Sequence, residues 1–245
     1  MAEYYKRIFR KDERIALVDL GWRGSIQHSL SDAVELLGFG CELEGLYFGV
    51  SPKSKWFDKQ PMHGFLFSKG VNEEAARDEE WFNALVESFF MAPHGTAMRY
   101  YFDEDSNAQV ELDTADNEGS PLFVLQEAAL QFVADCSARG WDKYEFLNKA
   151  NATEALYELG LAPSASEASS LGDCIFAYQE VSPLAKPQHE LAFYCLHPKS
   201  LYQELSLCYW KPAYLKRLVR LPLPYWRLLT RLKSSVRGTG DGINA

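Results

Sequence analysis

The chain has 245 residues, of which 47% are hydrophobic and 24% are charged, and its formal net charge is −9. This composition excludes a disordered or collagen-like chain and indicates a globular protein of one large or two small domains. No apolar run reaches the roughly 18 residues that cross a bilayer. The five cysteines are scattered without a C-x-x-C pair, which argues against a disulfide framework or a zinc site and favours a reducing cytoplasm.

Residues 15–50 predict one strand–helix–strand unit. An apolar run from Ile15 to Leu20 predicts a buried strand, and residues 25–37 carry apolar side chains at helical spacing. Ser25 is expected to cap this helix, and a second apolar run, Leu43 to Val50, predicts the next strand. We therefore predict the α/β class, with a Rossmann-like small sheet and flanking helices followed by a helical C-terminal region.

The turn between the first strand and the helix is the main candidate for a ligand site. Ligands of open α/β sheets bind where strands end and helices begin, and free N–H groups at a helix start attract anions. Arg23 can hold a phosphate, Trp22 can stack on a base or sugar ring, and Asp19 can act as a base. The predicted catalytic residues are Asp19 and His94, and the predicted ligand-binding residues are Gly21, Trp22, Arg23, Gly24, Ser25, Gln27 and Thr96.

A structural interpretation of the same turn stays open. The glycines can simply close it, with Trp22 as a lid on the core and Arg23 paired to an acid. The spacing matches neither standard nucleotide-binding fingerprint. Loop 51–60 directly follows the second strand, so Lys53, Lys55 and Trp56 either reach the same crevice or belong to a solvated loop that Trp56 anchors.

The middle of the chain predicts alternating elements. We expect a short strand at residues 64–67, a helix over 72–90 with a core-facing aromatic stripe, and a strand at 98–102. Residues 103–119 are expected to form a β-hairpin or a mobile loop. His94 follows the predicted helix and is either a general acid or base or a structural hydrogen-bonding group. Further helices are expected at 121–140 and 148–160, with another beginning near 165.

The last part of the chain is basic and amphipathic. It contains eight Lys or Arg from residue 211 onward and no acid between Leu205 and Gly240, and Pro222 and Pro224 divide it into two short helices. This pattern favours an element that lies on an anionic membrane surface. The alternatives are a helix that packs on the body and a nucleic-acid contact, which the acidic body disfavours. The predicted membrane-contact residues are Lys216, Arg217, Arg220, Trp226, Arg227 and Arg231.

Three strings resemble the C-terminal half of a bacterial family. They are Val18–Gln27, Gly45–Gly49 and Phe90–Thr96, and the resemblance covers about residues 10 to 135. The family consists of large proteins from capsule and lipopolysaccharide gene clusters, labelled predicted HAD-superfamily hydrolases, some of them fused to glycosyltransferase modules. The resemblance implies glycosyl transfer with a nucleotide sugar or another phosphate-bearing ligand, and an upstream HAD or glycosyltransferase half as partner.

One departure limits what the resemblance transfers. A HAD hydrolase needs an Asp-x-Asp motif after its first strand, but Leu20 and Gly21 follow Asp19 here, so phosphatase activity is disfavoured. The alternative function is a non-catalytic scaffold that docks a hydrolase or glycosyltransferase half onto the membrane, with the turn as an inter-domain contact.

The predicted organisation follows from these features. Residues 1–147 form an α/β domain that contains the Gly-Trp-Arg-Gly turn, residues 148–204 are mainly helical, and residues 205–245 form the basic tail. The predicted location is cytoplasmic and peripheral, on the inner face of the membrane. The sequence identifies no cofactor and no metal site.

Overall fold

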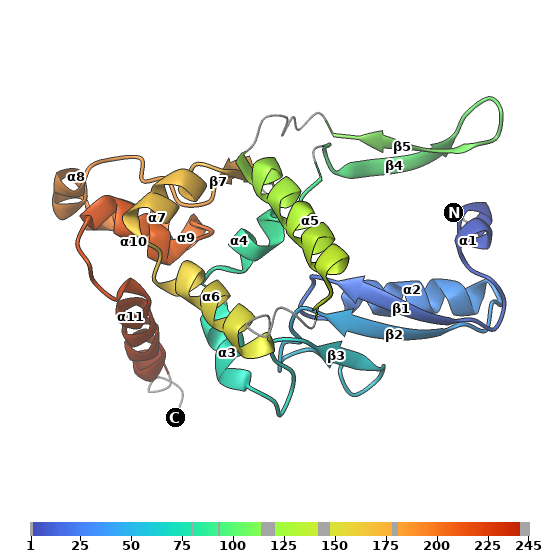
Figure 1. The fold of residues 1–245 in the computed structure, drawn as a ribbon. Coiled ribbons are helices and arrows are strands. Elements are labelled where there is room, and N and C mark those ends of the chain that lie inside the picture. Colours follow the sequence, from blue (N-terminus) through green and yellow to red (C-terminus); the bar gives the residue numbers. More distant parts are fainter. Residues whose placement is uncertain are drawn as a thin grey trace. The chain divides into compact units, whose positions relative to one another are not determined.

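A computed structural model describes residues 2–79, 81–92, 94–113, 121–141, 148–177 and 181–240. The protein is mixed α/β, with small sheets and many helices (Figure 1). It divides into two compact units, which we call unit 1 (residues 1–78 and 94–114) and unit 2 (residues 79–93 and 115–245). The three-part division suggested by the sequence stays a prediction.

The predicted strand–helix–strand unit is confirmed in unit 1. Strand β1 (Arg14–Asp19) and strand β2 (Glu42–Tyr47) are parallel neighbours, and helix α2 (Ser25–Leu36) connects them. Strand β3 (Met62–Gly64) pairs in parallel with β2, so the order is β1-β2-β3. β3 begins two residues before the strand that we expected at 64–67. Figure 1 shows α2 running along this sheet.

The expectation that the first strand is buried is wrong. β1 lies at the edge of the described sheet, and Val18 is 81% exposed. One face of the strand still contributes to a core, because Ile15 packs against a cluster formed by Phe9, Val34 and Leu43. The cluster also contacts the short N-terminal helix α1 (Ala2–Ile8) through Tyr5.

The helix expected over 72–90 is divided in two. Helix α3 (Glu73–Glu79) precedes helix α4 (Asn83–Ser88), and Phe82 between them has φ −146°, outside the helical region. This departure allows both Trp81 and Phe82 to be buried. The expected hairpin is confirmed as the antiparallel pair β4 (Ala97–Phe102) and β5 (Ala108–Leu112).

Unit 2 is mainly helical among its described residues. Two helix starts agree with the sequence: Asn148 caps α6, and Ser164 forms a capping box with Glu167 at the start of α7. No described helix is long and apolar enough to cross a membrane. The elements are α5 (Pro121–Arg139), α6 (Lys149–Leu161), α7 (Ala165–Gly172), β6 (Ile175–Ala177), β7 (Val181–Pro183), α8 (Leu191–Leu196), α9 (Pro198–Leu207), α10 (Lys211–Val219) and α11 (Tyr225–Gly240).

Helix α10 forms the centre of unit 2, where it contacts α6, α7 and α11. Its residues Ala213, Tyr214 and Leu218 are buried, and so is Trp210 immediately before it. The Trp210 indole N–H donates to the Gly160 carbonyl at 2.8 Å, which fixes the start of α10 to the end of α6. The predicted division of the basic tail into two helices is confirmed, but the first of them belongs to the core.

A carboxylate ties α8, α9 and α10 together. Both Tyr194 and Tyr214 donate hydrogen bonds to Glu204 Oε2, and the Gln188 backbone N–H is 3.3 Å from the same oxygen. Burial alone would raise the pKa of Glu204, but the hydrogen bonds from both tyrosines outweigh it and hold the pKa below its ordinary value. The ionised form of Glu204 is therefore the one that stabilises this part of unit 2.

This network predicts an acid-sensitive contribution to stability. Because the pKa of Glu204 is lowered in the folded state, its contribution is present at neutral pH and is lost as the pH falls below about 4.5. The melting temperature of the native chain should exceed that of Glu204→Gln at about pH 6, and the difference should shrink toward about pH 3. A constant difference across this range would show that Glu204 acts without its charge.

Candidate functional site

The predicted turn lies at the carboxyl end of β1, where the chain passes from Asp19 into α2. The Gly21 N–H donates to Asp19 Oδ1 at 2.7 Å, which orients the carboxylate. Gly24 is the N-cap residue of α2 with φ +75°, and a Cβ at this position would lie 2.4 Å from Met62 Cε. Glycine is therefore required here by both conformation and space. The expectation that Ser25 caps the helix is wrong, because Ser25 is already its first residue.

No side chain caps the start of α2. The N–H groups of the first helical turn have no carbonyl partner within the helix, and they form the positive end of its dipole. Ser25 is exposed at this end. It also lines a cavity of about 310 Å³, together with Tyr5, Ile26, Ser29 and Leu30. The arrangement can accept an anion.

Loop 51–60 lies beside this turn and holds its backbone in place. The Ser51 N–H donates to the Trp22 carbonyl at 2.8 Å, and the Ser54 hydroxyl donates to the Arg23 carbonyl at 2.7 Å. The Gln60 side-chain amide donates to the Gly24 carbonyl at 3.0 Å. Three successive carbonyls of the turn are thus bonded, so the conformation that presents Arg23 is fixed by hydrogen bonds from the loop.

The same loop brings cations to the first turn of α2. The Trp56 ring stacks on His28, with 3.6 Å between ring centroids. The ammonium groups of Lys55 and Lys59 each lie 4.9 Å from the Trp56 centroid. Arg23 is exposed, and within the described part of the chain its guanidinium has no ion pair. Positive charge therefore gathers next to the open helix end.

Asp19 is half-buried and acts on a neighbouring tyrosine. Burial, and after it the negative charge of Asp19, raise the pKa of Tyr47 to about 12. Tyr47 consequently remains protonated at neutral pH, and its hydroxyl donates to Gln27 Oε1 at 2.9 Å. Asp19 offers a free acceptor to a ligand hydroxyl, because its Oδ2 makes no hydrogen bond to a described residue.

Two predicted ligand residues have structural contacts instead. Trp22 stacks on Phe67 with 5.7 Å between ring centroids and meets Phe48 edge-on, which agrees with the interpretation of Trp22 as a lid on the core. Gln27 is fully buried, and its amide donates to the carbonyls of Leu43 and Pro61. All of its hydrogen-bonding atoms have protein partners, so we remove Gln27 from the ligand-binding set.

His94 and Thr96 lie at the base of the β4–β5 hairpin. His94 is exposed, and its Nδ1 is 2.9 Å from the Gly95 carbonyl. The Thr96 carbonyl accepts a hydrogen bond from the Asp113 N–H at 2.8 Å. Within the described residues, neither His94 nor Thr96 hydrogen-bonds to Asp19, so the structure does not join the two predicted catalytic residues.

The predicted membrane-contact residues divide between α10 and the segment after it. The Arg217 guanidinium donates to the Ala185 carbonyl at 2.7 Å and to both carboxylate oxygens of Asp173, and its side chain is only 17% exposed. Arg217 therefore contributes to packing and leaves the lipid-facing set. Lys216 and Trp226 are half-buried, whereas the remaining three are exposed: Arg220, Arg227 and Arg231.

His28, Lys59 and Tyr5 also lie near the start of α2, and the sequence did not predict them as site residues. Helical spacing could have found His28, because it follows Ser25 by three residues and therefore shares its face of α2. Among the described residues, no group of three or more His, Cys, Asp or Glu side chains is arranged to hold a metal ion. No protein-family model matches the chain, and no curated protein matches it.

Replacing Gln27 should destabilise unit 1 without touching the exposed turn. Gln27→Ala would remove three buried hydrogen bonds, two to the carbonyls of Leu43 and Pro61 and one from the Tyr47 hydroxyl, at a cost of about 2–4 kcal/mol in the free energy of unfolding. Urea denaturation of the full chain measures this, with hydrogen exchange of the β2 amides assigning the transition to unit 1.

The matched control is Ser29→Ala on an exposed position of the same helix, which should change stability by less than about 0.5 kcal/mol. Equal effects of the two substitutions would contradict a structural role for the buried amide.

Proposed function

We propose that unit 1 is a shortened Rossmann-like unit that binds the phosphate group of an activated sugar at the Asp19–Gly24 turn. The observation that carries this proposal is the open start of α2 beside an exposed Arg23, whose backbone is fixed by Ser54. Backbone N–H groups at a helix start and an arginine fork are both well-established means of holding phosphate in proteins.

The other charged groups near the turn fit the remainder of such a ligand. Lys55 and Lys59 add positive charge opposite the diphosphate of a nucleotide sugar. Asp19 offers a carboxylate oxygen to a sugar hydroxyl. Because Trp22 is packed on Phe67, we assign it to shaping the floor of the turn rather than to stacking on a base.

The resemblance to proteins of capsule and lipopolysaccharide gene clusters supports the same ligand class. We infer a module of a cell-surface polysaccharide biosynthesis enzyme, with glycosyl transfer as its reaction class and an upstream HAD or glycosyltransferase half as its partner. In this proposal Asp19 contacts the transferred sugar or its acceptor. His94 would join the reaction only if the ligand brought it to the turn.

The second candidate function is a membrane-docking scaffold, and the segment from Arg220 to Leu232 favours it. Four leucines are between 42% and 64% exposed there, which are Leu221, Leu223, Leu228 and Leu232. Exposed arginines lie among them, and the sequence has no acid between Leu205 and Gly240. Leucines that enter the interface and cations that meet lipid phosphates are the two contributions that hold a peripheral protein on an anionic membrane.

The phosphate site predicts a specific loss of affinity. Arg23→Ala should weaken the binding of a nucleotide sugar by about tenfold, because one charge-assisted hydrogen-bond fork is removed from the site. Titration calorimetry measures the change in affinity. Lys55→Ala and Lys59→Ala should weaken binding by smaller factors.

Arg10→Ala is the matched control, because Arg10 is an exposed cation that lies before β1, at the other end of the strand from the turn. Absence of binding heat with nucleotide sugars and simple phosphates alike would refute the phosphate site. An equal loss of affinity in Arg10→Ala would show that the ligand responds to the overall charge of the chain and not to a site at Arg23.

The docking segment predicts binding to anionic vesicles that weakens with salt. Arg227→Glu should weaken the affinity for these vesicles by about 10- to 30-fold, because each cation contributes on the order of 1 kcal/mol at such a surface. A co-sedimentation assay measures this affinity. Deleting residues 211–245 is not a suitable test, since it removes the buried helix α10.

Lys199→Glu in α9 is the control, since it makes the same charge change at an exposed position outside the segment. If the native chain ignores anionic vesicles at low salt, α11 is a packing element and the scaffold function is wrong.

A further inference from the structure

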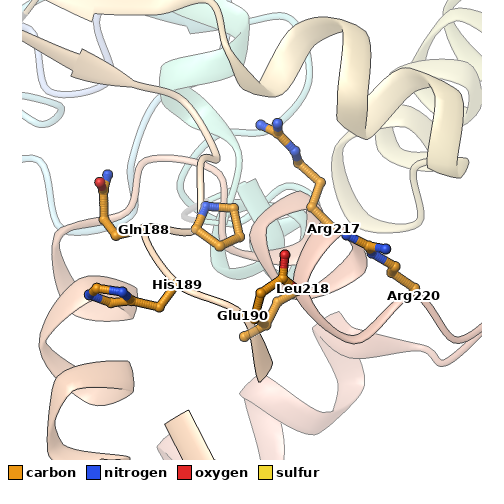
Figure 2. Close-up of a pocket in the computed structure, with 7 residues that line it drawn as sticks. Gln188, His189, Glu190, Arg217, Leu218 and Arg220 are labelled. Atoms are coloured by element: carbon orange, nitrogen blue, oxygen red, sulfur yellow. The ribbon is translucent and has the colours of Figure 1, made fainter. Parts of the chain in front are cut away.

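Unit 2 contains a polar cavity of about 430 Å³, and one of its lining residues, Arg220, also begins the proposed docking segment. Its lining comes from two segments about 30 residues apart in the chain, the loop 187–190 and the end of α10. Figure 2 shows Arg217 and Arg220 on one side, Gln188 and His189 on the other, and Glu190 between them. The volume is at the lower end of the range for small-molecule sites, which begins at about 300 Å³.

Arg220 is held in an unusual position at this cavity. It is the C-cap of α10 and has φ +62°, a left-handed conformation that glycine adopts readily and that side chains with a Cβ rarely adopt. Most helices that end in this way carry glycine or asparagine there. Glycine would close the helix with less strain, whereas the arginine found here contributes a guanidinium to the lining of the cavity.

The charges of the cavity are not paired with one another. Within the described residues, Arg220 and Glu190 both line the cavity, yet neither makes an ion pair or a side-chain hydrogen bond. Arg217 is fixed beside them by Ala185 and Asp173. A bound molecule with an anionic end and a hydroxyl end would satisfy both free groups, since guanidinium donates to phosphate and carboxylate accepts from hydroxyl.

We propose that this cavity binds the phosphate ester of a small polyol, with the phosphate at Arg220 and the polyol hydroxyls at Glu190. Two sources share this chemistry, a soluble ester such as glycerol 3-phosphate and the glycerol headgroup of phosphatidylglycerol. The lipid source rests on the proposed membrane contact, because the exposed Leu221 follows Arg220 directly. The soluble source stands on the cavity alone.

The test uses the full chain carrying Arg23→Ala, so that the proposed site in unit 1 is weakened about tenfold and is the same in every variant compared. Calorimetry with glycerol 3-phosphate and with inorganic phosphate probes the soluble source. Vesicle co-sedimentation with phosphatidylglycerol or phosphatidylserine, which carry equal net charge, probes the lipid source. We expect one of two results. Either glycerol 3-phosphate binds more tightly than inorganic phosphate, or the chain binds phosphatidylglycerol vesicles more tightly than phosphatidylserine vesicles.

Arg220→Gly should weaken that binding by at least about tenfold and should leave the melting temperature unchanged or higher, because glycine suits the left-handed position. Arg220→Asn, which also tolerates this conformation, serves as a second variant. Glu190→Ala should remove the preference for the polyol ester while inorganic phosphate binds no more weakly. Lys199→Ala removes an exposed cation of α9 that lies outside both the cavity and the docking segment, and it is the control.

Loss of soluble-ester binding in Arg220→Gly but not in Lys199→Ala supports the site and assigns it a free ligand. The same pattern seen only with phosphatidylglycerol vesicles assigns it a lipid headgroup. Equal losses in the two variants, or no preference for the polyol member of either pair, overturns the proposal. Because all variants share the Arg23→Ala background, the differences between them do not depend on the nucleotide-sugar site.

Discussion

The buried amide of Gln27 is the contact on which the geometry of unit 1 depends. It donates to carbonyls in β2 and in the segment before β3, and it accepts from the Tyr47 hydroxyl. The amide fits there because Gly45 has no side chain, as a Cβ on Gly45 would lie 2.1 Å from Gln27 Oε1. A buried amide is stable only when its groups are paired, so these hydrogen bonds fix the position of the first turn of α2 relative to β2 and β3. The direction of its free N–H groups follows from this link.

Local patterns in the sequence predicted the elements well, whereas burial was harder to predict. The glycines and the change of periodicity located β1, α2 and β2, and the polar residues Asn148 and Ser164 located two helix starts. The apolar run of β1 is also typical of a buried strand, but exposure depends on how many strands pair beside it, which is not a local property. Likewise, α10 has the composition of a membrane-surface helix, and only its contacts with α6 and α7 identify it as a core helix.

The part of the candidate site that could be predicted is the part whose residues are neighbours in the sequence. Asp19, Arg23 and Ser25 lie together because a single turn carries them, and loop 51–60 joins them because it follows the neighbouring parallel strand. Gln27 has the same local sequence context, but its orientation on α2 turns the amide into the core. His94 and Thr96 come from a distant segment, and no short-range rule could state whether that segment returns to the turn.

Charge places a further constraint on both proposed phosphate sites. The chain carries a net charge of −9, so at long range it repels an anionic ligand. Attraction must come from groups close to the ligand, and within the described residues Arg23 and Arg220 remain without ion pairs although acids are abundant. Each is held by its backbone, Arg23 through the bond from Ser54 to its carbonyl and Arg220 through its left-handed conformation. Added salt weakens these short contacts, but it also screens the repulsion from the acidic body. The affinity of either site for phosphate should therefore fall less steeply with ionic strength than it would on a basic protein.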